Sequence, residues 1–148
     1  MSISPFSNSF GQMQFADLDN DGDQDALTTN KFWNPYTQSF MGSSYVLINN
    51  GIGGLTPASV LPANNVVDHL LGYLDSDTDL DIFMVKDSDQ LNQVFLNNGD
   101  GTFVAAPTQP AGGLSNALDG ELGDMDGDGD LDAVILQNHG YQQSFNYC

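Results

Sequence analysis

One acidic segment occurs three times in this chain, and each copy runs directly into an apolar stretch. The copies begin at residues 17, 73 and 124 and read DLDNDGDQDAL, YLDSDTDLDIF and DMDGDGDLDAV. Two carboxylates about 4 Å apart repel each other by roughly 4 kcal/mol at an effective dielectric near 20. A hard divalent cation offsets that repulsion, and calcium prefers oxygen ligands in flexible loops. The segments therefore predict a repeat protein that carries calcium in its acidic loops.

The charge of the chain is concentrated in these segments. They hold 14 of the 20 acidic residues, whereas the 148 residues include only two basic ones, Lys31 and Lys86. So few cations do not neutralise nucleic-acid phosphates, and an anionic membrane surface repels such a chain. We therefore expect no nucleic-acid binding and no membrane insertion. Calcium loops of this kind fill best at millimolar calcium, which favours an extracellular or cell-surface location.

A period of about 50 residues organises the sequence. The acidic segments end at Asp25, Asp81 and Asp132, which lie 56 and 51 residues apart. Each segment follows a short apolar stretch and precedes an expected buried strand, at residues 26–29, 82–85 and 133–136. Residues 45–55 and 93–103 carry Asn-Gly between apolar runs, which is the strongest short hairpin signal. We predict repeats at residues 1–62, 63–110 and 111–148.

The predicted fold is all-β, because no apolar run has the 3.6-residue period of a helix. We expect propeller-type blades of four short antiparallel strands, with an acidic loop between the first two strands of each repeat. Repeat three stops before its Asn-Gly hairpin, and its tail, 141–148, is similar to the linker 36–40. The chain would then hold about two and a half repeats, as one β-repeat domain or as a piece of a larger one.

Incomplete blades leave strand edges and apolar faces exposed, and such edges pair with other chains. We therefore expect that the chain does not work as an isolated monomer. The expected partners are other copies of the chain or further covalent repeats.

The acidic segment together with VFLNNGDGTF at residues 94–103 resembles the FG-GAP/VCBS repeat family. These repeats are the calcium-binding propeller blades of integrin α-subunits and of many bacterial surface and secreted proteins. The resemblance implies ligand side chains at loop positions 1, 3, 5 and 9, and a backbone carbonyl at position 7. Gly22 and Gly129 fall at position 6, where the loop turns sharply. Loop two instead has Tyr73 at position 1 and Thr78 at position 6.

The resemblance thus implies two strong calcium sites, in loops one and three, and a weaker or degenerate site in loop two. The carbonyls implied at position 7 belong to Asp23 and Asp130. The candidate metal-binding residues are Asp17, Asp19, Asp21, Asp23 and Asp25 in loop one; Asp75, Asp77, Asp79 and Asp81 in loop two; and Asp124, Asp126, Asp128, Asp130 and Asp132 in loop three.

Other interpretations of the loops fit less well. An EF-hand needs a bidentate Glu at position 12, where this chain has Thr28 and Ile135. Thrombospondin-type calcium repeats resemble a cysteine-rich array, and this chain has a single cysteine. The remaining alternative is that the loops are solvated Asp-Gly turns without an ion, and this alternative is strongest for loop two.

The insertion at residues 31–41 carries the only tryptophan. Trp33 and Tyr36 are candidate ligand-binding residues, because aromatic faces suit sugar rings and binding residues favour loops on a rigid scaffold. The alternative is that these aromatic side chains cap the blade or pack on a neighbour. Asp68-His69 could form a catalytic triad together with a serine, but no nucleophile motif accompanies this pair. We therefore predict no enzyme.

The function predicted from the sequence is that of an extracellular calcium-binding surface or adhesion module that recognises protein or glycan. One alternative is a self-assembling subunit of a ring or an extracellular filament. Another is an accessory domain of a larger secreted enzyme.

Overall fold

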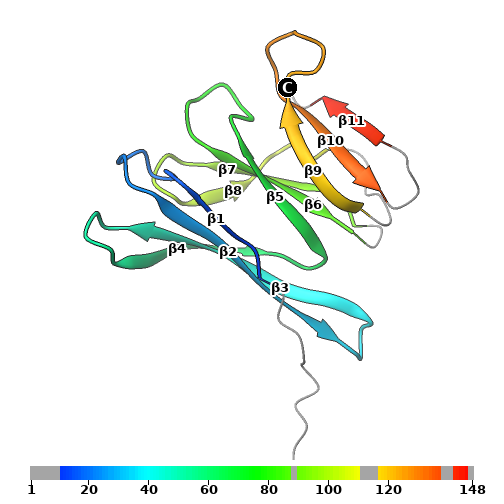
Figure 1. Ribbon diagram of the computed structural model, residues 1–148, viewed down its shortest axis with the longest axis horizontal. Helices are drawn as coiled ribbons and strands as arrows, with labels where there is room; N and C mark the ends of the chain where they lie inside the picture. The colour runs from blue at the N-terminus through cyan, green and yellow to red at the C-terminus, as the bar shows by residue number, and fades with distance from the viewer. Residues whose placement is uncertain (1–10, 88–89, 111–116, 138–141, 147–148) are drawn as a thin grey trace, which may run out of the picture.

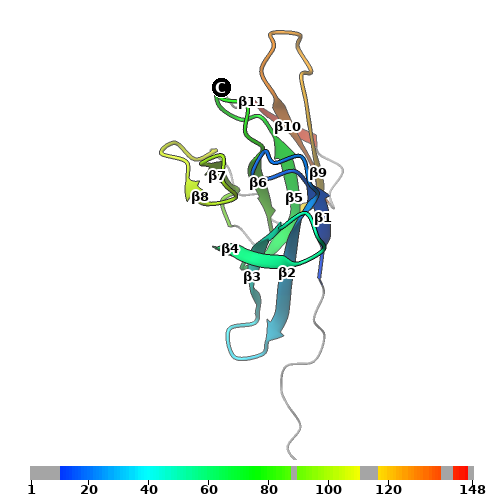
Figure 2. The ribbon, with the colours of Figure 1, turned by 90° about the vertical axis from the view of Figure 1, so that its left-hand side faces the viewer.

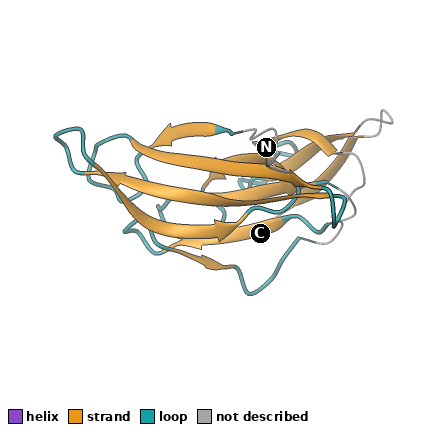
Figure 3. Cartoon of the chain, turned by 90° about the horizontal axis from the view of Figure 1, so that it is seen from below, coloured by secondary structure: helices purple, strands orange, loops and turns teal. Residues whose placement is uncertain are grey.

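The chain folds entirely into β-strands in the part that the computed structural model describes, residues 11–87, 90–110, 117–137 and 142–146. Eleven strands form three antiparallel sheets, which lie one after another in chain order (Figure 1). Figure 3 shows strands and loops without a helix among the described residues. Accordingly, the described chain offers no helix of the length and apolarity that a membrane crossing needs.

Each sheet is built from strands that are consecutive in the sequence. The first has the order β1-β2-β3-β4, the second β5-β6-β7-β8 and the third β11-β10-β9. The bounds are β1 (Met13–Ala16), β2 (Asp25–Asn34), β3 (Ser39–Asn49), β4 (Leu55–Pro62), β5 (Val66–Gly72), β6 (Asp81–Lys86), β7 (Gln93–Asn97), β8 (Phe103–Ala105), β9 (Ala117–Gly123), β10 (Asp132–Gln137) and β11 (Gln142–Asn146). The predicted all-β fold and antiparallel pairing are confirmed. The repeat boundaries at 62 and 110 stay a prediction.

The acidic loops occupy the same place in all three sheets. Residues 17–24 join β1 to β2, residues 73–80 join β5 to β6, and residues 124–131 join β9 to β10. Thr28 and Ile135, at the position where an EF-hand has its ligand, lie inside β2 and β10. The loops are therefore connections between the first two strands of a sheet, as the sequence predicts.

The first sheet differs from the prediction of short strands. β2 has 10 residues and β3 has 11, because the insertion at 31–41 extends both strands into a long hairpin. Trp33 faces Phe40 across this hairpin with the rings 5.1 Å apart and edge to face, and the ammonium of Lys31 lies 5.7 Å from the Phe40 ring. Such cross-strand aromatic and cation–π pairs stabilise a two-stranded ribbon. The insertion is thus a hairpin extension with a turn at 35–38.

The third sheet also differs from the prediction. The tail that resembles the linker 36–40 forms β11, which pairs with β10 in a register that places Asn146 opposite Asp132. The third sheet therefore has three described strands instead of two. The reason is that the open edge of β10 presents backbone groups that a following segment can pair with.

Two separate hydrophobic cores hold the three sheets together. β6 lies at the centre, with all six residues buried, and successive side chains point to opposite faces. Ile82 and Met84 belong to the core shared with the first sheet, whereas Phe83 and Val85 belong to the core shared with the third. Figure 2, the view turned by 90°, shows the second sheet between the other two. The sheets therefore stack face to face as successive layers.

Candidate calcium loops

Loops one and three each gather three carboxylates at one point. One oxygen from each of Asp17, Asp19 and Asp21 lies within 4.8 Å of the others, and Asp124, Asp126 and Asp128 form the same kind of group. These are loop positions 1, 3 and 5. The predicted ligands at these positions are thus close enough to share one hard cation.

Loop one contains a buried carboxylate oxygen with no partner in the described protein. Asp17 Oδ2 accepts a hydrogen bond of 3.0 Å from the backbone N–H of Gly22, whereas Asp17 Oδ1 is buried and accepts none. An orphaned buried carboxylate oxygen is costly, because it has lost water without gaining a partner. A bound cation would supply the missing partner, so the residues of loop one fit calcium.

The backbone of loops one and three bends into the left-handed region at the same two positions. At position 4, φ is 61° for Asn20 and 81° for Gly127, and at position 6 it is 92° for Gly22 and 100° for Gly129. The expected glycine turn at position 6 is confirmed. Glycine meets this need at little steric cost, and asparagine tolerates the left-handed region better than most residues do.

Loop two lacks these features in the described structure. Tyr73 replaces the first carboxylate and is 57% exposed, and neither Ser76 nor Thr78 has a positive φ. Asp75 and Asp77 keep the local hydrogen bonds of the loop, each accepting the N–H two residues ahead at 2.9 Å. Loop two therefore keeps part of the loop geometry without a group of three carboxylates.

The aspartate at position 9 has a different environment from the ligand group. Asp25 is fully buried, and its Oδ2 accepts the N–H of Leu18 at 2.7 Å while its Oδ1 accepts the N–H of Asn49 at 2.7 Å. Asp81 repeats both bonds, with Leu74 at 2.9 Å and Asn97 at 2.8 Å. This residue ties the acidic loop to the end of the third strand.

Asp132 forms the loop half of this tie, since its Oδ2 accepts the N–H of Met125 at 3.0 Å. The structure does not bring Asp25 or Asp132 into the groups of three carboxylates. Their role as calcium ligands stays a prediction. This tie is not predicted from the acidic motif, although the Asn-Asn-Gly hairpin that follows the position-9 aspartate in the first two repeats is the sequence signal for it.

The position-7 side chains also lie apart from the ligand group. Asp23 Oδ2 lies against Gly51, and Asp79 Oδ2 lies against Gly99, so that a Cβ at either glycine would approach the carboxylate to 2.7 Å. Both glycines belong to the Asn-Gly turns of the same sheets. In the first two sheets the position-7 side chain therefore lies against the hairpin of its own sheet, and the position-7 carbonyl ligand that the resemblance implies stays a prediction.

Burial and like charge act together on the loop carboxyls. Partial desolvation raises the pKa of Asp19, and the charges of Asp25, Asp21 and Asp17 raise it further, against a backbone N–H from Asp21 that lowers it. Desolvation likewise raises the pKa of Asp81. At Asp19 and Asp81 the environment therefore disfavours the charged carboxylate, and a nearby cation would favour it again.

A buried polar cluster lies between the first and second sheets. Ser44 Oγ is 2.8 Å from His69 Nε2, Thr29 Oγ1 is 3.0 Å from Ser44 Oγ, and Gln12 Oε1 is 3.4 Å from His69 Nδ1. Ser44 is 0% exposed and His69 is 2% exposed. Burial, followed by the charge of Lys31, lowers the pKa of His69 from 6.5 to about 4. The histidine is therefore neutral at pH 7 and joins two sheets.

The candidate ligand residues lie on the hairpin extension. Tyr36 is 84% exposed in the turn, and Trp33 is 39% exposed at the end of β2. The Trp33 ring packs on Phe40 of the same hairpin. Recognition of a ligand by Trp33 and Tyr36 stays a prediction.

Residues 73–135 match the family model of the FG-GAP-like repeat. The matched segment contains loops two and three and the β7–β8 hairpin, so this part of the chain is similar to FG-GAP-like repeats. The comparison confirms the resemblance inferred from the acidic segment and the Asn-Asn-Gly hairpin. Such a repeat indicates a protein-interaction module. No curated protein and no solved structure gave a significant match to the chain.

Proposed function

We propose that this chain is a calcium-stabilised extracellular interaction module made of FG-GAP-like repeats, in which calcium is structural and recognition is of protein or glycan. The observation that carries this proposal is the loop geometry. Three carboxylates converge in loop one around a buried oxygen of Asp17 that has no partner, and loop three repeats the same grouping. FG-GAP repeats are typical of extracellular proteins, where calcium is plentiful enough to fill such loops.

The stacking of the sheets supports a propeller-type arrangement. Gln14 of β1 donates to the carbonyl of His69 on β5 at 2.8 Å, and β5 in turn contacts β9, so the first strands of the three sheets lie side by side. The acidic loop follows the first strand in each sheet. Radial repetition of four-stranded sheets is how propellers protect their strand edges. Further sheets of the same kind would extend the stack.

A self-assembling or repeat-extended form is the second candidate, because the outer faces of the stack are apolar. On the first sheet, Met13, Phe15 and Val60 are each about 60% exposed, and on the third Leu118 is 52% and Leu136 is 44% exposed. Met13 shares a cross-strand row with Val60, and Phe15 lies two residues along β1 on the same face. Exposed apolar faces of this kind mark interaction surfaces.

We propose no catalytic role. Among the described residues, Ser44 contacts His69, and both are buried, so this hydroxyl–imidazole contact is closed to a substrate. That contact acts instead as a satisfied polar link in the interface between sheets.

Calorimetric titration of the metal-free protein with calcium tests the proposal. We expect at least two sites, and we expect one to disappear in Asp19→Ala and the other in Asp126→Ala. Because calcium would bind only the folded state, each site should raise the free energy of unfolding by about 2.7 kcal/mol when the free calcium concentration is 100 times the dissociation constant. Chelation should therefore lower the melting temperature. A stoichiometry below one, or identical melts with and without chelator, would contradict the proposal.

A further inference from the structure

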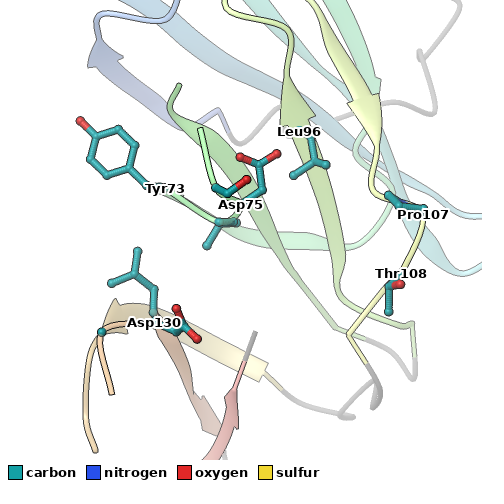
Figure 4. A pocket seen from close by; sticks show the side chains of 10 residues that line it. Tyr73, Asp75, Leu96, Pro107, Thr108 and Asp130 are labelled. Atoms are coloured by element: carbon teal, nitrogen blue, oxygen red, sulfur yellow. The ribbon is translucent and has the colours of Figure 1, made fainter. Parts of the chain in front are cut away.

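A groove of about 610 Å³ lies between the second and third sheets, next to the acidic loops (Figure 4). Residues 73–76 of loop two and Leu96 of β7 line one side, Pro107 and Thr108 follow β8, and residues 129–131 of loop three line the other side. In Figure 4, Leu96 and Asp75 lie across the groove from Asp130. The walls are thus partly apolar, with carboxylates on both rims.

The corresponding space between the first and second sheets is filled by a hairpin. Asn97, at the end of β7, donates from Nδ2 to the carbonyl of Leu18 at 2.8 Å, and the N–H of Phe103 donates to Ser59 Oγ at 3.2 Å. Gly101 sits so close to Ile48 that a Cβ there would collide with the Ile48 side chain. The β7–β8 hairpin of the second sheet therefore seats itself on the first sheet.

In the second repeat, the groove corresponds to the site on the first sheet where the β7–β8 hairpin lies. Aligning the acidic segments places Leu74 and Ser76 at the positions of Leu18 and Asn20, and aligning the Asn-Asn-Gly hairpins places Leu96 at the position of Ile48. Two groove residues, Leu74 and Leu96, therefore correspond to residues that receive the β7–β8 hairpin, whereas Ser76 corresponds to Asn20, which donates to Asp79 of loop two at 2.7 Å. The established interface and the groove are two copies of one arrangement.

In the described structure, the third sheet has three strands and lacks the fourth strand whose hairpin would occupy the groove. In the second sheet Ile82 pairs with Phe95, so the next residues along β6 and β7, Asp81 and Leu96, form the following pair. In the third sheet Asp132 corresponds to Asp81 and pairs with Asn146, so Asn146 takes the position of Leu96. The residue that follows Leu96 is the one that reaches the neighbouring sheet.

We propose that this groove binds a β-hairpin of the type Asn-Asn-Gly-x-Gly, supplied by a further FG-GAP-like repeat, which adds the fourth strand beside β11. Glycine suits the apolar wall at Leu96 because a side chain there would collide, as it would at Gly101 against Ile48. The asparagine amide would donate to the carbonyl of Leu74. This inference rests on the proposed function, since the occupant is a repeat of the same family.

A second copy of the chain is a poorer donor for this groove. Its own Asn97 is 4% exposed, and the Asn97 amide also donates to the carbonyl of Leu80 at 3.1 Å, so the β7–β8 hairpin is held within its own molecule. Releasing it would open the first interface between sheets. The rim carboxylates Asp75 and Asp130 further favour a hairpin less acidic than the loops.

A labelled synthetic peptide with the sequence of residues 97–106, NNGDGTFVAA, tests the proposal by fluorescence anisotropy against the full chain in calcium. We expect saturable binding at one peptide per chain. A peptide with alanine for the first asparagine, or valine for the second glycine, should bind about tenfold more weakly or worse, because a lost buried hydrogen bond or a clash costs about 1.4 kcal/mol or more.

Variants of the protein locate the binding. Ser76→Trp fills the groove and should weaken peptide binding by about tenfold or more, whereas Thr78→Trp, in the same exposed loop but outside the groove, should leave it unchanged. A chain in which the peptide sequence follows Asn146 makes the contact intramolecular at roughly millimolar effective concentration. That fusion should melt higher than the original chain and should no longer bind free peptide.

Absence of saturable binding together with an unchanged melt of the fusion would overturn the proposal. Equal weakening by Ser76→Trp and Thr78→Trp would also overturn it, because the peptide would then lie elsewhere. If unlabelled chain displaces the peptide at equal concentration, the occupant is a second copy and the assignment to a further repeat is wrong. Calcium titration on the same preparation separates the two proposals: two intact calcium sites without peptide binding would refute only the hairpin seat.

Discussion

At the scale of single residues, the aspartates of one acidic loop divide into two groups with different partners. Asp17, Asp19 and Asp21 turn toward one another, where only a cation relieves their repulsion. Asp25 is buried and already accepts two backbone N–H groups, one from the loop and one from the end of β3. The two groups should therefore respond differently when calcium is removed.

We expect Asp25→Ala to destabilise the protein with or without calcium, by about 2–5 kcal/mol, because it leaves two backbone donors without an acceptor. Asp19→Ala should destabilise only in calcium, and in chelator it should be neutral or slightly stabilising, since it removes a like charge. Urea denaturation in saturating calcium and in excess chelator measures both. An Asp25→Ala variant that equals the original chain in chelator would contradict the tie.

Two neighbouring residues on β5 give opposite pH dependences. The pKa of His69 is lowered to about 4 by burial, so the unfolded chain takes up a proton between pH 6.5 and about 4 that the folded chain does not. Stability from this residue is lost as the pH falls through that range. Burial, and then the neighbouring Asp119 carboxyl, raise the pKa of Asp68 from 3.8 to about 6. The folded state gains that proton first, so stability from Asp68 is lost as the pH rises through about 6.

We therefore expect the two contributions to oppose each other between pH 4 and 6 in the original chain. Asp68→Asn should remove the opposing contribution of Asp68 and keep that of His69, so that the free energy of unfolding falls more steeply as the pH is lowered from 6.5 to 4. His69→Gln should change the slope in the opposite direction. Urea midpoints at half-unit pH steps in saturating calcium measure the slopes, and parallel curves for all three proteins would refute the assignment.

At the scale of elements, the acidic loop and the Asn-Gly hairpin of one sheet act as a pair. The position-9 aspartate receives the N–H of the hairpin asparagine in both four-stranded sheets, and the position-7 aspartate lies against the hairpin glycine. The loop is therefore held from its strand side, independently of the ion. Loop two keeps this support although it has lost the first carboxylate and both left-handed residues.

Because that support remains, loop two should recover a strong site with few changes. We expect Tyr73→Asp combined with Thr78→Gly to raise the calcium stoichiometry by one, since these changes restore the carboxylate at position 1 and the turn at position 6. Tyr73→Asn with Thr78→Gly, which lacks the charge, should bind the added calcium more weakly. Calorimetric titration measures both, and an unchanged stoichiometry in the aspartate variant would show that loop two lacks further determinants.

At the scale of the whole molecule, the three sheets share two cores and leave an apolar face at each end of the stack. The chain also carries a net charge of −18, which repels other copies until calcium neutralises part of it. Association through the end faces should therefore depend on calcium. Phe15 and Met13, 61% and 60% exposed, are apolar side chains on the outer face of the first sheet.

We expect sedimentation velocity in calcium, at micromolar concentration, to show species larger than the 15.9 kDa chain. Phe15→Lys should shift the distribution toward the monomer, because it places a charge on the apolar end face. Tyr36→Lys changes a more exposed aromatic on the hairpin extension, away from the end face; it serves as the control and should leave the distribution unchanged. A compact monomer in calcium with cooperative unfolding would refute this expectation.

The sequence by itself determined the features that depend on local chemistry. Alternating aspartates with glycine at position 6 define the loop wherever it is placed, and Gly22 and Gly129 adopt the expected left-handed backbone. Alternating or continuous apolar runs between turn signals define strands, so the all-β fold and the place of each loop could be predicted. The degeneracy of loop two was visible in Tyr73 and Thr78 for the same reason.

Tertiary structure alone decided which side chains have partners across the molecule. The two backbone donors bound by Asp25, the contact between Ser44 and His69, and the filled seat under Gly101 join residues 7 to 53 positions apart in sequence. The extension of the first hairpin and the pairing of β11 with β10 also depended on open strand edges and cross-strand contacts. Periodicity reports which face of a strand is apolar, but which neighbour covers that face is decided only when the sheets stack.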